Sequence, residues 1–320
     1  MCDVIKAPLP LMLSVIPISS EYISLKNSGG EIPKLHDFAL SNGFRYTSQE
    51  ILLGESKVVC ENIKNRFLIV DEGNLDVNQP QSHGSYSQVY FVSFCAKSFA
   101  YKKYTTPLDC GLAISTLREI SVLTLISHSH IVDMVGIVVN DGVINGVLLE
   151  RGICDVRKYL SSNSFSKKEL VSIVPGLISA LKYVHSLGVC HCDIKPDNII
   201  VFSNRSGDIT LKITDWGLGK TGSDDCGSSG SVVCALGYRP PEVLWGGVGV
   251  DYTAVDIWSF GCVVWYLWKK QRLFHGDDEK GLLEDILTTN IAKKAKDIPK
   301  FLRKIVIGSV NINPSRRFLV

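Results

Sequence analysis

Apolar and polar positions follow two different patterns along the chain. In the first half, short runs rich in β-branched and aromatic residues are typical of strands. The predicted strands cover 67–70, 89–94, 98–104, 131–139 and 143–149. Residues 112–125 instead have the period of a helix, and an Asn-Asp-Gly turn separates the last two strands. This half therefore predicts a small sheet with one helix.

The second half is mostly helical. Residues 255–268 are apolar on nearly every side, which predicts a buried helix. Short strands are predicted at 199–202 and 211–213, joined by a turn at 204–207. One further helix has a single apolar face, formed by Leu170, Ile173, Val174, Leu177, Leu181 and Val184. A sheet-rich part followed by a larger helical part predicts an α+β fold with two lobes. Residues 1–66 show no clear period and are predicted to be an extension.

Composition narrows the class of protein only moderately. The 320 residues are 45% hydrophobic and 21% charged, as in ordinary globular proteins, and a net charge of +2 does not predict binding to nucleic acid or membranes. Ten cysteines without a C-x-x-C pair predict free thiols in a reducing compartment, so we expect an intracellular protein of the cytoplasm or nucleus. The apolar stretch 9–18 contains two prolines and makes a poor signal peptide.

The strongest chemical signal is residues 191–198 (HCDIKPDN), followed seventeen residues past Asn198 by Asp-Trp-Gly at 215–217. Phosphoryl transfer needs a carboxylate that orients the attacking hydroxyl, cations that neutralise the phosphates, and oxygen ligands for Mg²⁺. These roles fit Asp193 as the carboxylate, Lys195 as the cation at the γ-phosphate, and Asn198 and Asp215 as the metal ligands.

These two segments resemble the catalytic loop (H-R-D-x-K-x-x-N) and the D-F-G motif of eukaryotic protein kinases. The resemblance runs from about 76 to 318, and the lysine two residues after the catalytic aspartate is typical of the serine/threonine branch. It implies an N-lobe at about 67–149, a hinge at 150–153 and a C-lobe at 154–320. It also implies Mg²⁺-dependent transfer of the γ-phosphate of ATP to serine or threonine of protein substrates. A compact, divergent kinase of this kind would suit a large DNA virus.

Two segments of the first half resemble the partners of an activating ion pair. Residues 99–102 (FAYK) are similar to V-A-I-K, which implies that Lys102 grips the α- and β-phosphates. Residues 115–120 (STLREI) resemble the αC helix of cyclin-dependent kinases, with Glu119 as the partner of Lys102. An exposed strand lysine and a surface glutamate are the plain alternatives. The same helix could receive an activator, or it could be self-sufficient.

The resemblance also implies a nucleotide site. The glycine-rich loop at 82–89 (SHGSYSQV) keeps only its middle glycine, which predicts weakened phosphate contacts. Backbone groups of Glu150 and Gly152 would bind the adenine, and Asp155 would reach the ribose. The side chains of Val89, Ala100 and Ile200 would enclose the adenine ring. The full set of expected ATP-binding residues is Ser82, Gly84, Val89, Ala100, Lys102, Glu150, Gly152, Asp155 and Ile200.

Further landmarks follow in order. Residues 238–242 (YRPPE) resemble the A-P-E end of the activation segment, and residues 256–261 (DIWSFG) resemble the central helix of the C-lobe. The resemblance implies that Asp256 binds the catalytic-loop backbone and that Arg317 pairs with Glu242.

Three positions depart from the family. Cys192 replaces the arginine of H-R-D, Trp216 replaces the phenylalanine of D-F-G, and Ala235 stands where many serine/threonine kinases have threonine. The last change calls the positioning of Asp193 into question. A pseudokinase that acts by contact, and a small-molecule kinase of related fold, remain alternatives. Retention of all six chemistry-bearing residues favours an active kinase: Lys102, Glu119, Asp193, Lys195, Asn198 and Asp215.

Overall fold

The chain divides into two compact units. The first contains residues 1–124 and 133–151, and the second contains residues 125–132 and 152–320. The computed structural model describes residues 13–14, 50–53, 56–60, 67–83, 87–94, 96–105, 114–140, 143–221, 234–246 and 249–318.

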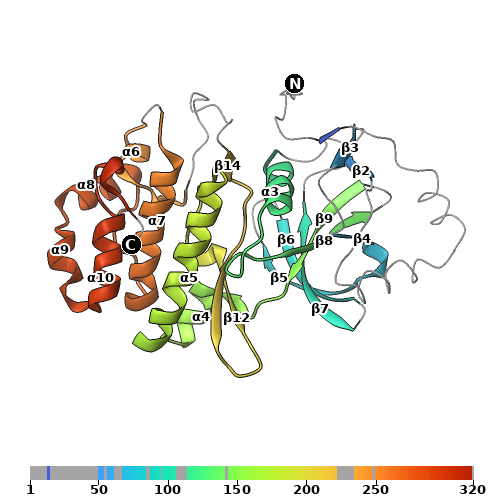
Figure 1. Cartoon of the computed structure of the whole chain (residues 1–320), viewed down its shortest axis with the longest axis horizontal. Helices are drawn as coiled ribbons and strands as arrows, with labels where there is room; N and C mark the ends of the chain where they lie inside the picture. The colour runs from blue at the N-terminus through green and yellow to red at the C-terminus, as the bar shows by residue number, and fades with distance from the viewer. Residues whose placement is uncertain are drawn as a thin grey trace, which may run out of the picture. The chain divides into compact units, whose positions relative to one another are not determined.

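The first unit is built on a six-stranded sheet in the order β4-β8-β9-β7-β6-β5 (Figure 1). Its strands are β4 (Leu68–Asp71), β5 (Asp76–His83), β6 (Ser87–Phe94), β7 (Lys97–Tyr104), β8 (Met134–Asn140) and β9 (Val143–Glu150). The 3-10 turn η1 (Glu72–Asn74) and the helix α3 (Ile114–Leu125) complete this part. The predicted strands and helix are confirmed, except that β8 begins at Met134 instead of residue 131 and that residues 112–113 of the helix lie outside the described part. Apolar residues of β4, β6, β7, β8 and β9, mainly β-branched and aromatic, form the core.

Two features at the edges of this sheet were not predicted: the parallel direction of β4 and the strand β5. β4 pairs with β8 in the parallel direction, whereas the other neighbours are antiparallel. β5 has the polar sequence DVNQPQSH, which gives no strand signal. Its register with β6 shifts on both sides of Pro80, which lacks a backbone donor and is tolerated here because β5 is an edge strand.

Parts of the expected extension also form strands. β1 (Leu13–Ser14), β2 (Glu50–Leu53) and β3 (Ser56–Cys60) make an antiparallel sheet in the order β1-β3-β2. Such short pairings leave little periodic signal in a sequence, which explains why none was expected in residues 1–66.

The second unit is dominated by helices, with α7 packed against both α5 and α10 (Figure 1). Its α-helices are α4 (Val156–Ser162), α5 (Lys167–Ser186), α6 (Pro241–Leu244), α7 (Tyr252–Lys269), α8 (Glu279–Thr288), α9 (Ile291–Lys294) and α10 (Lys300–Ser309). Its 3-10 turns are η3 (Pro196–Asn198), η4 (Leu236–Tyr238), η5 (Ala295–Asp297) and η6 (Pro314–Arg316). Its strands are β10 (Cys154–Asp155), β11 (Val189–Cys190), β12 (Ile199–Ser203), β13 (Ile209–Ile213) and β14 (Lys220–Thr221).

Two predicted helices organise this unit. The apolar face predicted for α5 is buried along its whole length, and a capping box of Ser166 and Glu169 fixes where the helix begins. α7 is buried on nearly every side, as its continuous apolar sequence predicts. None of the helices in the described part of the chain has both the length and the apolar composition needed to cross a membrane. A sheet-rich unit and a helical unit confirm the predicted α+β class.

Candidate active site

The segment 191–198 brings three predicted site residues together in the second unit. Lys195 Nζ donates to Asp193 Oδ2 at 2.6 Å, and Asn198 Nδ2 donates to the same oxygen at 3.0 Å. The other oxygen, Oδ1, accepts from the backbone amide of Ala235 at 2.9 Å. Asp193 is only 7% exposed, so its carboxylate is fixed in orientation by three donors. The backbone of Ala235 makes its contact without a side-chain hydroxyl.

Asn198 is oriented by the same carboxylate. Its two amide hydrogens point to Asp193, one at the backbone carbonyl (2.9 Å) and one at Oδ2 (3.0 Å). The amide oxygen is therefore turned away from these bonds and could act as a metal ligand. Asp215 follows β13 and adopts φ +67°, a left-handed conformation that is uncommon for a residue other than glycine. An amide oxygen and a carboxylate suit Mg²⁺, which prefers oxygen ligands and keeps several waters.

His191 joins the catalytic segment to the chain just before Asp215. Its Nε2 lies 2.9 Å from the carbonyl oxygen of Thr214, and its Nδ1 accepts from the amide of Asp193 at 3.2 Å. The ring packs against Trp216, with centroids 4.6 Å apart. Trp216 is completely buried, so its larger ring fits at the position where the family usually has phenylalanine. Its indole N–H has no hydrogen-bond partner of normal geometry within the described residues.

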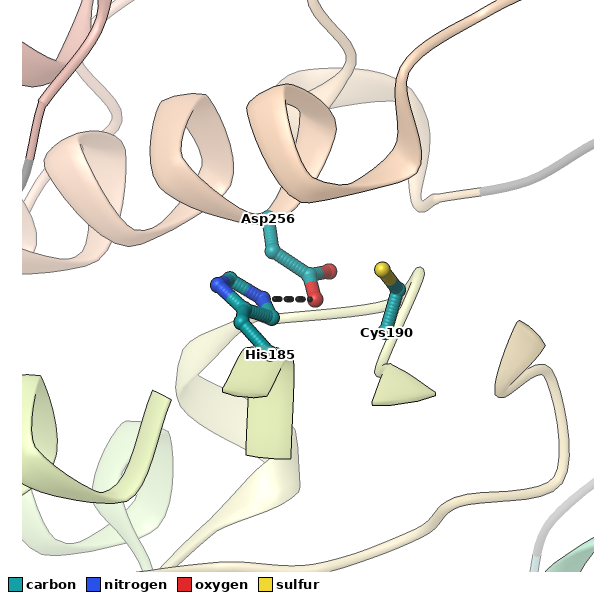
Figure 2. Close-up of side chains that lie close together, drawn as sticks. All are labelled: His185, Cys190 and Asp256. Carbon is teal, nitrogen blue, oxygen red and sulfur yellow. Dashed lines mark hydrogen bonds and ion pairs between the residues drawn. The ribbon is translucent and has the colours of Figure 1, made fainter. Parts of the chain in front are cut away.

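Asp256 supports this segment from below, as expected. Its two oxygens accept from the backbone amides of His191 (2.7 Å) and Cys192 (2.8 Å). Figure 2 shows the carboxylate reaching from α7 toward His185 at the end of α5, with Cys190 of β11 on its other side. His185 Nε2 lies 3.0 Å from Asp256 Oδ2, and the side chain of Asp256 is fully buried. The loop is therefore anchored to the most buried helix of the unit.

The three side chains in Figure 2 lie close enough to hold a metal, since their ligand atoms are within 4.8 Å of one another. However, Asp256 already accepts hydrogen bonds on both oxygens. Burial raises the pKa of Cys190 to about 12, so its thiol stays protonated, and its Sγ lies 3.5 Å from Thr253 Oγ1. A neutral thiol and an occupied carboxylate make a poor metal site, so we assign this cluster a structural role.

The cysteine that replaces the usual arginine is enclosed. Cys192 is 0% exposed and packs with Cys190, Cys234 and Val255. Burial, and then the negative charge of Asp256, raise the pKa of its thiol well above the ordinary range. Cys192 and Cys234 both have φ near +65°, and the amide of Cys234 donates to the carbonyl of Cys192 at 2.9 Å. The position of the family's arginine is thus occupied by an uncharged, inaccessible group.

A second ion pair, absent from our expectations, lies beside the catalytic carboxylate. Arg157 of α4 binds Asp197 in the bidentate manner, with Nε–Oδ1 at 2.6 Å and Nη2–Oδ2 at 2.7 Å. Burial alone would raise the pKa of Asp197, but the hydrogen bonds and charge of Arg157 outweigh it and hold that pKa below its usual value. No sequence motif links the two residues, which are forty positions apart.

In the first unit, Lys102 of β7 and Glu119 of α3 form the expected ion pair at 2.7 Å. The side chains are 12% and 2% exposed. The second carboxylate oxygen accepts from Tyr104 Oη at 3.3 Å. The pair is therefore shielded from solvent and geometrically fixed.

The residues expected around the nucleotide divide between the units. Val89 lies in β6 opposite Lys102, and Ala100 lies two residues before that lysine in β7. The backbone of Ser82 pairs with Val89, whereas Gly84 lies outside the described residues. Their predicted roles toward ATP stay predictions.

At the expected hinge, the amide of Glu150 donates to the carbonyl of Asp133 at 3.0 Å. Gly152 packs so tightly against Ile200 that a Cβ would overlap that side chain, which explains the glycine. The carboxylate of Asp155 caps α4, accepting a backbone hydrogen bond at 2.8 Å.

The end of the activation segment is tied to the C-terminal part of the chain. Arg317 Nη1 and Nη2 donate to the two oxygens of Glu242 at 2.6 and 2.7 Å, as expected. The Arg317 guanidinium lies 4.9 Å from the ring centroid of Trp258, and its side chain is fully buried.

Comparison with known proteins decides the family. The sequence pattern of the protein kinase domain matches residues 81–319, about three quarters of the chain. The chain belongs to the protein kinase family. The predicted kinase fold, with a strand-rich N-terminal and a helical C-terminal part, is therefore confirmed, and ATP is the phosphate donor that this family uses.

Several relatives narrow the group. A protein of Encephalitozoon cuniculi named a probable cell division protein kinase is 30% identical over 73% of this chain and 89% of its own length. Cyclin-dependent kinase 12 of Caenorhabditis elegans is 31% identical over 63% of this chain and 29% of its own. The CTD kinase subunit alpha of Schizosaccharomyces pombe is 35% identical over 55% and 29%. This kinase is a serine/threonine kinase similar to the cyclin-dependent group, and the pseudokinase alternative is not favoured.

Proposed function

We propose that the chain is a catalytically active, Mg²⁺-dependent kinase that phosphorylates serine or threonine of protein substrates. In this proposal residues 67–149 form the N-lobe, 150–153 the hinge and 154–320 the C-lobe, while 1–66 is an extension. Asp193 orients the substrate hydroxyl, and Lys195 neutralises charge at the γ-phosphate. Lys102, held by Glu119, binds the α- and β-phosphates. The relatives named above support the class of activity.

The hydrogen bonding of Asp193 is the observation that carries the proposal. A carboxylate has about four acceptor sites. Lys195, Asn198 and the amide of Ala235 fill three of them, so one remains for the hydroxyl of a substrate. Because the other bonds fix the carboxylate, the hydroxyl would be received in one orientation, which is what in-line transfer requires. A fold retained only for contact has no need of this arrangement.

The metal and the nucleotide fit the same residues. The amide oxygen of Asn198 and the carboxylate of Asp215 would hold Mg²⁺, which neutralises charge on the phosphates when bound. The left-handed backbone of Asp215 supports a constrained role, since strain of this kind persists where the surroundings enforce it. The proposed adenine contacts are Val89, Ala100 and Ile200, with the backbones of Glu150 and Gly152. Ser82, Gly84 and Asp155 would contact the rest of the nucleotide.

Names of relatives raise the question of a cyclin-like activator on the helix α3. The pairing of Lys102 with Glu119 at 2.7 Å is already formed in the single chain. This supports a self-sufficient helix over one that waits for a partner. An activator at 115–120 is the second candidate, favoured only by the resemblance of that segment to cyclin-dependent kinases.

The test removes the acceptor charge of Asp193. Asp193→Asn should lower turnover at least about 100-fold, because the hydroxyl loses its orienting carboxylate, while binding of Mg-ATP persists. Turnover on a generic protein substrate and nucleotide affinity by calorimetry give the two readouts. Asp297→Asn, an exposed acid in η5, makes the same chemical change elsewhere and should leave both unchanged. Wild-type turnover in the Asp193 variant would overturn the proposal.

A further inference from the structure

A polar pocket of about 390 Å³ opens beside the catalytic carboxylate, entirely within the second unit. Two of its lining residues, Lys195 and Ala235, are the same groups that bond directly to Asp193. A residue of an extended peptide advances the chain by about 3.3–3.6 Å. A side chain within a few positions of the phosphorylated residue would therefore reach this pocket.

Three of the five charged residues that line the pocket are cations, namely Arg157, Lys195 and Arg272. The acid Asp197 has both oxygens occupied by Arg157. Arg272, by contrast, is exposed and forms neither a hydrogen bond nor an ion pair with any residue in the described part of the chain. None of its five N–H donors is used by a residue in the described part of the chain, and together they form a planar fork that matches carboxylate and phosphate groups. The remaining acid, Asp277, lines the pocket but is exposed and does not pair with Arg272.

The side chain of Arg272 lies close to the backbone of Gly237. Gly237 lies in η4, the turn that follows Ala235. A Cβ at Gly237 would lie 3.1 Å from Cδ and Nε of Arg272 and 3.3 Å from Cζ. The guanidinium group therefore lies closely against the glycine backbone, and any larger residue would push it away.

A buried hydroxyl in the same wall also lacks an acceptor. Tyr238 is 3% exposed, and its Oη has no hydrogen-bond partner of normal geometry within the described residues. The neighbouring group is the guanidinium of Arg157, which can only donate. The hydroxyl proton therefore has no acceptor among the described residues, and because Oη itself is inaccessible, Tyr238 contributes to the wall of the pocket and not to ligand binding.

We propose that this pocket binds an anionic side chain, a carboxylate or a phosphate, of the protein substrate, with Arg272 as the recognition group. The inference rests on the proposed kinase function, since it assigns a specificity to that activity. Substrates would thus carry an acidic or already phosphorylated residue at one fixed distance from the phosphorylated residue.

The experiment is a positional scan of synthetic peptides with a central serine. At each flanking position the residue is Asp, phosphoserine, Asn or Lys. We expect one position at which Asp or phosphoserine raises kcat/KM about tenfold over Asn. Comparison of Asp with phosphoserine identifies which anion the pocket prefers. Arg272→Glu should abolish the gain and favour Lys at that position. Arg205→Glu makes the same charge change on the exposed turn between β12 and β13 and should keep the wild-type preference.

A binding measurement separates this inference from the proposed function. The same peptides with a central alanine cannot be phosphorylated, and their affinity is measured by fluorescence anisotropy. If no peptide is phosphorylated but the acidic ones bind in a manner that requires Arg272, the pocket assignment stands and the proposed activity is wrong. If peptides are phosphorylated without any acidic preference, or with a preference for Lys, the pocket assignment is overturned. Absence of both binding and phosphorylation would overturn both.

Discussion

At the scale of single residues, two neighbouring lysines of one strand form ion pairs in different environments, one buried and one at the surface. Lys102 and Lys103 are adjacent in β7, so their side chains leave opposite faces of the sheet. Lys102 meets the buried Glu119, whereas Lys103 pairs at 2.7 Å with Glu72, and that lysine is 36% exposed. Both bonds have the same length, but only the first lies in a shielded environment, where loss of one partner leaves an unpaired charge.

This contrast gives a matched pair of variants. Lys102→Met should abolish turnover and lower the free energy of unfolding by about 3 kcal/mol, because the buried carboxylate of Glu119 loses the ammonium group that pairs with it at 2.7 Å. Lys103→Met should cost less than about 1 kcal/mol, since Glu72 keeps Tyr101 and Asn145 as donors. Urea denaturation and steady-state kinetics on both proteins are the measurements. Equal losses of stability would show that burial of Glu119 does not set the cost.

Spacing in the sequence grouped Asp193, Lys195 and Asn198, and the structure brings them together because residues on one loop have fixed relations to one another, while their roles in the reaction stay predictions. The network around Asp193 was predicted less well. Ala235 acts through its backbone amide, which every residue except proline possesses, so its side chain gave a misleading signal. The pair of Arg157 and Asp197 depends on two segments meeting in space, which no local pattern encodes.

At the scale of secondary structure, α5 carries two residues that normally disfavour a helix. Pro175 and Gly176 lie in its middle, yet the helix runs unbroken from Lys167 to Ser186. Pro175 is exposed and lacks the N–H that would bond to the carbonyl of Val171. Gly176 instead has a clear packing reason, since a Cβ there would overlap the ring of His130.

These neighbours should respond to alanine in opposite directions. Pro175→Ala restores a backbone donor and should raise the free energy of unfolding by about 1–3 kcal/mol. Gly176→Ala should lower it by a similar amount, because the ring of His130 is held by a 2.9 Å contact between Nδ1 and the carbonyl of Leu211. Thermal and urea unfolding of both variants test the pair. A gain in stability from Gly176→Ala would show that helix propensity outweighs packing at this site.

Elements also differed in how readily the sequence predicted them. α7 combines length with continuous apolar character, so its burial was predictable. β5 contains Asn, Gln and Pro, and it is a strand only because β6 supplies a partner for its backbone. The direction of β4 depends likewise on its neighbour β8. Strand pairing is a tertiary property, so patterns within one segment do not determine it.

At the scale of the whole molecule, the question is what switches the enzyme on. In kinases controlled by phosphorylation, the added charge orders the activation segment by pairing with arginine. The residue beside the catalytic aspartate is here Cys192, which is fully buried and uncharged. The catalytic loop is held instead by Asp256 and by the backbone pairing of Cys192 with Cys234. These contacts need no phosphate.

We therefore expect the purified single chain to be active without phosphorylation of its activation segment and without a partner. The segment from Asp215 to Glu242 offers the acceptors Thr221, Ser223, Ser228, Ser229 and Ser231, whose side chains lie outside the described part. Replacing all five by alanine should change turnover less than threefold relative to phosphatase-treated wild type, with both near the usual range of about 1–100 per second.

Two results would contradict this expectation, and they point to different causes. In the first, the turnover of both the five-alanine variant and the phosphatase-treated protein is at least tenfold below that of untreated protein, which corresponds to about 1.4 kcal/mol of transition-state stabilisation. Phosphorylation would then control the enzyme even without the usual arginine. If all three preparations are equally slow, the missing element is a partner, and α3 is the surface to test because it carries Glu119. Glu119 already contacts Lys102 in the isolated chain, so a partner would have to act on something other than that pairing.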